Sequence, residues 1–133
     1  MFQVERIDHV VLRARDVPRL VSFYEGALGM HVERRLERIG LVQLRAGASL
    51  LDVVPAKAGD AVGGRNMDHL CFRIDPFDLG EIRARLAPFG IAPGEIVDRY
   101  GAEGTGPSIY FDDPEGNQVE LKGPAREPAV RVK

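Results

Sequence analysis

The chain has 133 residues, 44% hydrophobic and 29% charged, a composition typical of an ordinary soluble domain. Its 18 Lys and Arg nearly balance its 20 Asp and Glu, so a net charge of −2 argues against a nucleic-acid or anionic-membrane partner. One cysteine excludes an internal disulfide framework, and without a membrane-length apolar run or a secretory signal pattern we expect a cytoplasmic protein.

The first half of the chain predicts a β-α-β-β-β module over residues 6–54. A β-branched-rich run around His9 predicts a strand over residues 6–13. Asp16 is suited to cap a helix that has Pro18 in its first turn and continues at helical spacing until Gly29. Three further strands are expected over residues 30–36, 40–44 and 48–54.

The second half predicts the same module again over residues 66–122. Residues 55–65 are rich in Ala, Gly and small polar side chains and predict a linker. A strand over 67–74 and a helix over 78–87 follow. Strands are then expected over 91–97, 108–111 and 118–122, and a polar, loosely held tail over 123–133.

The two halves also match residue by residue. "RIDHVVLRARD", from Arg6, and "NMDHLCFRIDP", from Asn66, each contain Asp-His, three apolar residues and Arg, about sixty residues apart. Such a repeat indicates two supersecondary units that cover one another. The sequence therefore predicts a single α+β domain, in which two tandem βαβββ modules form curved mixed sheets around a cleft.

Four side chains are expected to face that cleft. Successive strand residues alternate between faces, so the apolar residues beside His9 and His69 turn toward the helices, and the two imidazoles turn away. The same count places Asp52 and Glu120, from the last strand of each module, on the imidazole face. This set suits Zn²⁺, Ni²⁺, Mn²⁺ or Fe²⁺, with positions left open for substrate. The alternative is a pair of His-carboxylate hydrogen bonds across an empty cleft.

Three other features allow simpler readings. Arg13 could hold a substrate carboxylate or be a solvated strand end. Cys71, on the cleft face, is expected to be a small apolar wall rather than a nucleophile. "GAEGTGP", residues 101–107, resembles a phosphate loop but precedes no helix pattern, so we expect a mobile loop near the cleft mouth.

The stretches "IDHVVLRARDVPRLVSFYEGALGM", "MDHLCFRID" and "YFDDPEGNQVEL" resemble the vicinal oxygen chelate superfamily. That superfamily includes glyoxalase I, extradiol dioxygenases, fosfomycin-resistance transferases and bleomycin-binding proteins. The resemblance covers about residues 6–122 and is closest to glyoxalase I-like members. It assigns the metal positions to His9, Asp52, His69 and Glu120, although Asp52 stands where glyoxalase I has Glu.

The resemblance implies a lyase or isomerase of a small α-oxo or hemithioacetal substrate, acting through a metal-stabilised enediolate. Glu120 is the first choice as the proton-shuttling base, and Asp52 would hold the metal or share the proton. Arg13 is the one glutathione-binding position that carries over, and glutathione stays open as a co-substrate.

Two other functions remain open within this resemblance. One is Fe²⁺-dependent dioxygenase chemistry, for which two His and one carboxylate suffice. The other is a metal-free protein that sequesters a drug or metabolite. Both modules leave an open sheet edge, so we expect a homodimer, with the site built within one chain or between two.

Overall fold

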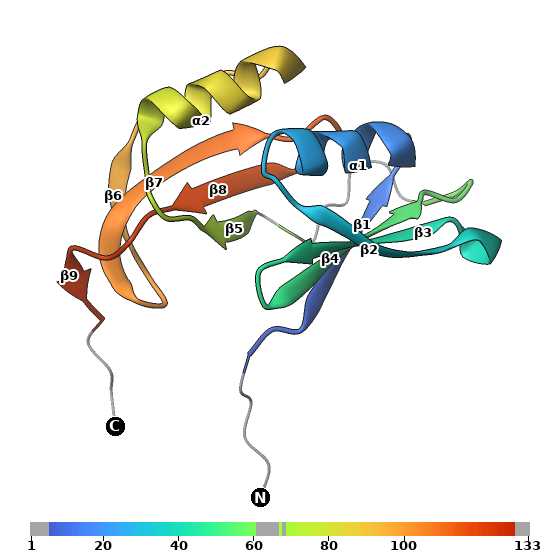
Figure 1. The fold of residues 1–133 in the computed structure, drawn as a ribbon, viewed down its shortest axis with the longest axis horizontal. Coiled ribbons are helices and arrows are strands. Elements are labelled where there is room, and N and C mark those ends of the chain that lie inside the picture. Colours follow the sequence, from blue (N-terminus) through green and yellow to red (C-terminus); the bar gives the residue numbers. More distant parts are fainter. Residues whose placement is uncertain (1–5, 61–66, 68, 130–133) are drawn as a thin grey trace, which may run out of the picture. The chain divides into compact units, whose positions relative to one another are not determined.

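The computed structural model describes residues 6–60, 67 and 69–129. These residues form two compact units, which meet in sequence between Gly63 and Gly64 (Figure 1). Each unit is described by itself below.

The first unit is one mixed four-stranded sheet with a helix. Its strands lie in the order β1-β4-β3-β2, with β1 parallel to β4 and the other pairs antiparallel. The elements are β1 (His9–Ala14), α1 (Val17–Gly26), β2 (His31–Leu36), a 3-10 turn (Glu37–Ile39), β3 (Leu41–Ala46) and β4 (Ser49–Pro55).

The second unit repeats this arrangement. Its order is β5-β8-β7-β6, again with the first and last strands of the module parallel, and the short β9 is added beside β7. The elements are β5 (Leu70–Arg73), α2 (Leu79–Leu86), a 3-10 turn (Ala87–Phe89), β6 (Val97–Gly101), β7 (Gly104–Asp112), β8 (Gln118–Lys122) and β9 (Glu127–Pro128). The α+β class and the tandem βαβββ modules are confirmed.

Both helices begin with the same cap. The carboxylate of Asp16 accepts a hydrogen bond from the amide of Arg19 at 3.1 Å, and that of Asp78 accepts one from the amide of Glu81 at 3.0 Å. Each bond satisfies an amide that has no partner within its helix. The repeat therefore includes the local signal that starts each helix.

Each helix covers the apolar face of its own sheet. In the first unit, α1 buries Phe23 and Tyr24 completely, as the helical spacing predicts. In the second, α2 lies along one face of the β5–β8 sheet (Figure 1) and buries Ile82 and Leu86. Apolar strand residues complete the two cores: Leu12, Ala14, Leu44, Leu51 and Val53 in the first, and Ile109, Phe111, Val119 and Leu121 in the second.

Several predicted elements have different bounds, and β7 in particular begins at Gly104, four residues before the predicted strand over 108–111. The first helix ends at Gly26, because Gly29 adopts a left-handed φ of 70° and closes the helix with a turn. The strand expected over 91–97 lies instead at Val97–Gly101. Pro93 has no amide hydrogen to donate to a strand ladder, which favours irregular structure before β6.

The loop predicted over residues 101–107 is instead part of a hairpin, and the tail predicted to be loosely held is hydrogen-bonded over its described residues. Residues 101–107 form the turn and paired ends of the β6–β7 hairpin. The tail packs against the same hairpin, since the amide of Arg126 bonds to the carbonyl of Thr105 at 2.8 Å and that of Ala129 to Glu103 at 3.0 Å. A Cβ on Gly104 would lie 2.0 Å from the Glu127 carbonyl oxygen, so the tail needs this glycine. Residues 130–133 lie outside the described chain.

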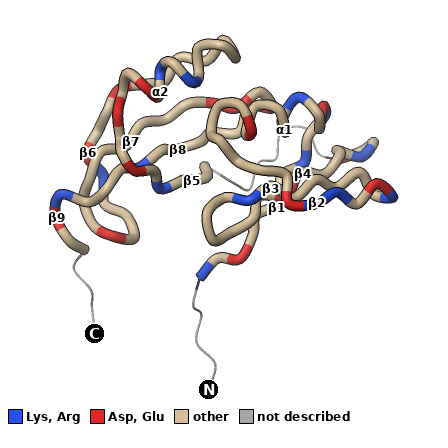
Figure 2. The backbone as a smooth tube through the Cα atoms, in the orientation of Figure 1, with Lys and Arg blue, Asp and Glu red and all other residues tan. Residues whose placement is uncertain are grey.

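Charged residues are spread along both units. Figure 2 shows acidic and basic positions interspersed along β1–β4 and around β6–β9, so neither sign is confined to one unit. Among the described residues, no helix has the length and apolar content needed to cross a membrane.

Candidate functional site

In each unit, the parallel strand pair brings a carboxylate beside the strand that begins at or directly after the His of the Asp-His repeat. Asp52 of β4 stands opposite Val11 of β1. Val11 is two residues after His9, so the two side chains lie on the same face of the strand. Glu120 of β8 stands opposite Cys71 of β5, and His69 directly precedes that strand. Because side chains alternate along a strand, each imidazole and its carboxylate share a sheet face, as the sequence predicts.

In the first unit, His9 is held by its neighbour in sequence. Its Nδ1 lies 2.9 Å from Oδ2 of Asp8. This hydrogen bond, supported by the nearby charge of Asp52, raises the pKa of His9 against the opposing effect of desolvation. In the neutral ring, Nδ1–H donates to Asp8, and Nε2 then carries the lone pair that a metal ion requires.

Asp52 is buried with an incomplete set of partners. Only 4% of the residue is exposed. Its Oδ2 accepts a hydrogen bond from Nε2 of Gln43 on β3 at 3.2 Å. Its Oδ1 is buried and has no hydrogen-bond partner among the described residues. An unpartnered buried carboxylate oxygen costs about 1–3 kcal/mol, so this atom is the one in the site that most needs a further ligand.

In the second unit, Glu120 is almost as buried, at 6% exposure, but is well supplied with donors. The hydroxyl of Ser108 donates to Oε2 at 2.7 Å, and Nε2 of His69 lies 3.5 Å from Oε1. Tyr110 and Cys71 also hydrogen-bond to this carboxylate. Burial raises the pKa of Glu120, but these hydrogen bonds and the adjacent imidazole outweigh it and lower the pKa below its usual value.

The groups around Glu120 pack on one another. The ring of Tyr110 meets His69 edge to face, with centroids 5.4 Å apart, and the guanidinium of Arg99 lies 5.0 Å from the Tyr110 centroid. The hydrogen bond to Glu120 raises the pKa of Tyr110, with burial adding to the effect. The phenol is therefore held as a neutral donor to the carboxylate.

Cys71 is not an activated nucleophile. Burial, together with the charge and hydrogen bond of Glu120, raises the pKa of its thiol to about 12. A reactive cysteine needs a lowered pKa, because the thiolate is the attacking species. This agrees with the sequence-based expectation that the residue is a wall of the site.

The candidate metal ligands thus form one imidazole-carboxylate pair in each unit. Within the described part of either unit, no three His, Cys, Asp or Glu side chains are grouped as metal ligands. The donor chemistry of the pairs fits a borderline divalent cation, which takes imidazole nitrogen and carboxylate oxygen together. The unpartnered Oδ1 of Asp52 fits the same group, since a cation would satisfy it.

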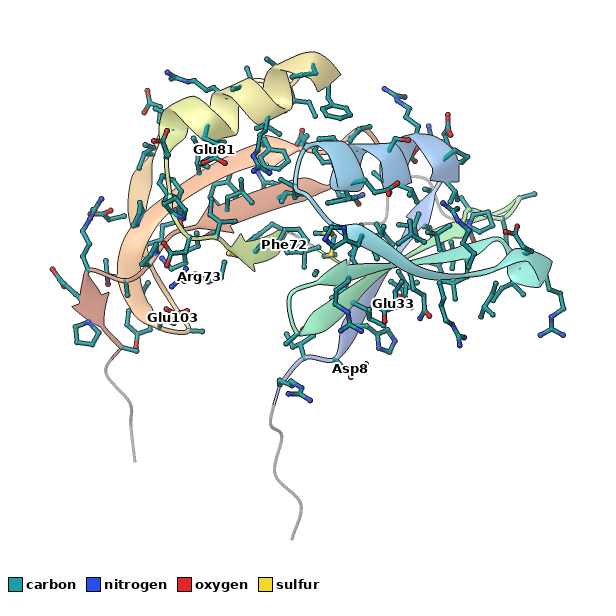
Figure 3. The ribbon with its side chains drawn as sticks, viewed as in Figure 1. Asp8, Glu33, Phe72, Arg73, Glu81 and Glu103 are labelled. Atoms are coloured by element: carbon teal, nitrogen blue, oxygen red, sulfur yellow. The ribbon has the colours of Figure 1, made fainter. Side chains whose placement is uncertain are left out.

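The two repeat-related arginines have acidic neighbours. Arg13 is largely exposed, with its Nε 3.5 Å from Oδ2 of Asp60. Arg73 forms a two-point pair with Glu103, at 3.0 and 3.1 Å, which ties β5 to the β6–β7 turn (Figure 3). Arg73 is therefore a structural residue of its unit, whereas the substrate role of Arg13 stays a prediction.

Three residues of the site were missed from the sequence: Gln43, Ser108 and Tyr110. Gln43 and Tyr110 stand directly opposite Asp52 and Glu120 on the neighbouring antiparallel strand. Both could have been found by pairing the last strand of each module with the strand before it. That pairing requires the register of the hairpin, which the sequence does not give. Ser108 lies two residues before Tyr110, on the same face.

Comparison with known proteins gives the same fold. Virulence protein STM3117 of Salmonella typhimurium is 29% identical over 124 residues, covering 89% of this chain and 83% of that protein. Its crystal structure has a TM-score of 0.74 at 26% identity, covering 93% of this chain and 100% of that chain. Fosfomycin resistance protein FosX of Mesorhizobium japonicum is 26% identical over 120 residues, covering 89% of this chain and 85% of that protein.

A more distant structure shares the fold alone. Lactoylglutathione lyase from Agrobacterium tumefaciens is 24% identical, with a TM-score of 0.65 and coverage of 90% of this chain and 94% of that chain. The family model for the Glyoxalase/Bleomycin resistance protein/Dioxygenase superfamily matches residues 6–121. With the repeated βαβββ topology, this match shows that the chain belongs to the Glyoxalase/Bleomycin resistance protein/Dioxygenase superfamily.

Proposed function

We propose that the chain is a divalent-metal-dependent, glyoxalase I-like enzyme that acts on a small substrate with two adjacent oxygen atoms. The observation that carries this proposal is the buried, unpartnered Oδ1 of Asp52. In a sequestering protein that binds no metal, this atom would only destabilise the fold, because a buried carboxylate oxygen without a hydrogen bond costs free energy. A cation bound beside it removes that cost.

We propose His9, Asp52, His69 and Glu120 as the ligands of one ion, which takes an imidazole and a carboxylate from each pair. When bound, such an ion supplies Lewis-acid polarisation of a carbonyl oxygen. The chain itself supports the ligands: Asp8 orients the His9 ring, and Gln43 and Ser108 each hold one carboxylate oxygen. Supported ligands bind metal more tightly than free ones.

Proton transfer is assigned first to Glu120. Its lowered pKa keeps the carboxylate ionised at neutral pH, and its Oε1, which Ser108 does not contact, lies 3.5 Å from Nε2 of His69. A positioned base of this kind contributes about 10²–10⁴-fold in rate. The phenol of Tyr110 hydrogen-bonds to the same group and keeps it within the site. Asp52 completes the ligand set or shares the proton.

Fosfomycin resistance is a second candidate. It is favoured by one observation, the 26% identity with FosX over 89% of this chain. Asp52 supplies the second carboxylate that glyoxalase chemistry uses, but it is one methylene shorter than the Glu that glyoxalase I has at this position, so it does not separate the two functions. The two functions differ in substrate and can be separated by one set of assays.

The test begins with metal analysis of the purified full-length protein. The protein is then stripped with a chelator, reloaded with Ni²⁺, Zn²⁺, Mn²⁺ or Fe²⁺, and assayed with the hemithioacetal of methylglyoxal and glutathione, and separately for loss of fosfomycin. We expect about one equivalent of metal and metal-dependent hemithioacetal turnover. His69→Ala should reduce that turnover at least a hundredfold, because it removes one of four ligands.

Other outcomes assign other functions. Fosfomycin loss without hemithioacetal turnover would replace the main proposal with the second. Substrate-dependent oxygen consumption by the Fe²⁺-loaded protein, and by none of the other metal-loaded forms, would assign dioxygenase chemistry. Failure to bind any of the four ions would favour the sequestering role. Glu33→Gln is the matched control, since Glu33 lies on β2 and pairs with Arg45 at 3.0 Å rather than with either His-carboxylate pair.

A further inference from the structure

We propose that Ser108 and Gln43 are positioning residues that select which carboxylate oxygen faces the cation. Each holds one oxygen of its carboxylate and leaves the other to the metal. This inference rests on the proposed metal site and adds to it two residues outside the ligand set. Neither was singled out by the sequence.

The case is strongest at Ser108. The residue is 1% exposed, and its hydroxyl donates to Oε2 of Glu120 at 2.7 Å. The other oxygen, Oε1, lies 3.5 Å from Nε2 of His69, the partner ligand of the same unit. A short hydrogen bond to a charged acceptor is among the stronger ones, so the carboxylate is held against rotation about its last bond. Oε1 is therefore presented beside the imidazole.

The same division occurs at Asp52. Nε2 of Gln43 donates to Oδ2 at 3.2 Å, and Oδ1 is the buried oxygen that lacks a partner among the described residues. A side chain that only fills space on β3 would not need to hydrogen-bond to Asp52, whereas the Gln43 amide bonds to Oδ2 and not to Oδ1. The choice leaves the unpartnered oxygen fixed in place rather than averaged over two rotamers.

The two residues act from non-equivalent positions. Gln43 stands directly opposite Asp52, as Tyr110 does opposite Glu120. Ser108 lies two residues before Tyr110, and the residue two before Gln43 is Leu41, whose side chain cannot donate a hydrogen bond. Because Tyr110 also hydrogen-bonds to Glu120, the strand position opposite the carboxylate supplies a donor in both units. Ser108 is a further donor in the second unit, from a position where the first unit has a leucine side chain.

Loss of a support of this kind typically weakens metal binding about 10–100-fold. The test measures Mn²⁺ binding to the chelator-treated full-length protein by calorimetry, with free Mn²⁺ followed by electron paramagnetic resonance. Ser108→Ala should raise the Kd about 10–100-fold. Gln43→Leu should raise it at least about threefold, and the smaller effect reflects the longer hydrogen bond that Gln43 makes. Neither readout depends on turnover.

Two variants separate positioning from packing. Ser49→Ala removes a hydroxyl that donates to the Ile7 carbonyl at 2.9 Å, on the sheet face opposite Asp52, and should bind Mn²⁺ like the parent. Ser108→Thr keeps the hydroxyl and should bind within about threefold of the parent. If Ser108→Ala proves unfolded by circular dichroism, Gln43→Leu decides the proposal by itself.

Contradictory results are clear-cut. Kd values within about twofold of the parent in both Ser108→Ala and Gln43→Leu would overturn the inference, as would equal losses in Ser108→Ala and Ser108→Thr. A parent that binds Mn²⁺ but turns over neither substrate contradicts the proposed reaction alone, and the Kd differences still decide the positioning roles. A parent that binds none of the four divalent ions overturns both proposals.

Discussion

The two units of this protein share a topology but treat their central carboxylates differently. Asp52 is flanked on its sheet by Val11 and Gln43, and Glu120 by Cys71 and Tyr110. One flanking residue can donate a hydrogen bond in the first unit, and both can in the second. Ser108 adds a further donor to Glu120.

This contrast separates the effect of the fold from that of the side chains. The repeated strand order puts a carboxylate at the same place in both sheets, because the last strand of each module lies between the first and third. Whether that carboxylate is satisfied depends on residues from neighbouring strands. Glu120 is stable as a buried anion by itself, whereas Asp52 needs one more partner.

The largest expected effect concerns the thiol beside Glu120. With a pKa of about 12, Cys71 should react with iodoacetamide at pH 8 about 10–100-fold more slowly than cysteine in an unstructured peptide. The rate should increase in Glu120→Gln, which removes the neighbouring charge. The matched variant for the first unit is Val11→Cys in a Cys71→Ala background, because Val11 occupies the equivalent position beside Asp52 and both residues are exposed, so a difference in rate reports the neighbouring groups. It should react faster than Cys71, and equal rates would contradict the contrast.

Next comes the stability of the metal-free protein. Glu120→Gln should lower the free energy of unfolding by about 1–3 kcal/mol, because the donors around Glu120 lose a charged acceptor. Asp52→Asn should be neutral or stabilising by up to about 1 kcal/mol, because the buried unpartnered oxygen no longer carries charge. Urea unfolding after chelator treatment measures both. Equal destabilisation by the two substitutions would show that the carboxylates are equivalent.

The acid dependence of stability follows from Glu120. Since its pKa is lowered in the folded state, the carboxylate stabilises the fold above its unfolded pKa, and this contribution is lost as pH falls through the folded pKa. The gap in unfolding free energy between the parent and Glu120→Gln should therefore be full at pH 7 and narrow progressively below about pH 4.5. Urea titrations at pH 7, 4.5 and 3.5 on metal-free protein test this. A gap that widens on acidification would contradict the direction of the shift.

The smallest expected effect comes from giving Asp52 a donor. Val11→Thr replaces one methyl group by a hydroxyl on the strand position opposite Asp52. A new hydrogen bond to the unpartnered oxygen should stabilise the metal-free protein by about 0.5–1.5 kcal/mol and weaken metal binding by competing with the ion. Thermal melts with and without Mn²⁺ measure both changes. Val10→Thr, on the other face of the same strand, is the control and should not change the metal affinity.

The sequence predicted more of the fold than of the site. The repeat, the strand-helix periodicity and the Asp caps were enough to place both βαβββ modules. The tail was missed because its hydrogen bonds run to Glu103 and Thr105, far back along the chain, and because Gly104 leaves room for it. No local pattern in a polar tail reports such a contact.

The sequence by itself determined which face of each strand carries His9, His69 and the two carboxylates, because side chains alternate along a strand whatever surrounds it. Only the tertiary structure decided what those carboxylates touch. Ser108 reaches Glu120 and Gln43 reaches Asp52 through the register of antiparallel neighbours, and register depends on turns and packing between strands rather than on either strand alone. As a result, Glu120 is buried among several hydrogen-bond donors, whereas Asp52 is buried with one carboxylate oxygen that lacks a partner among the described residues.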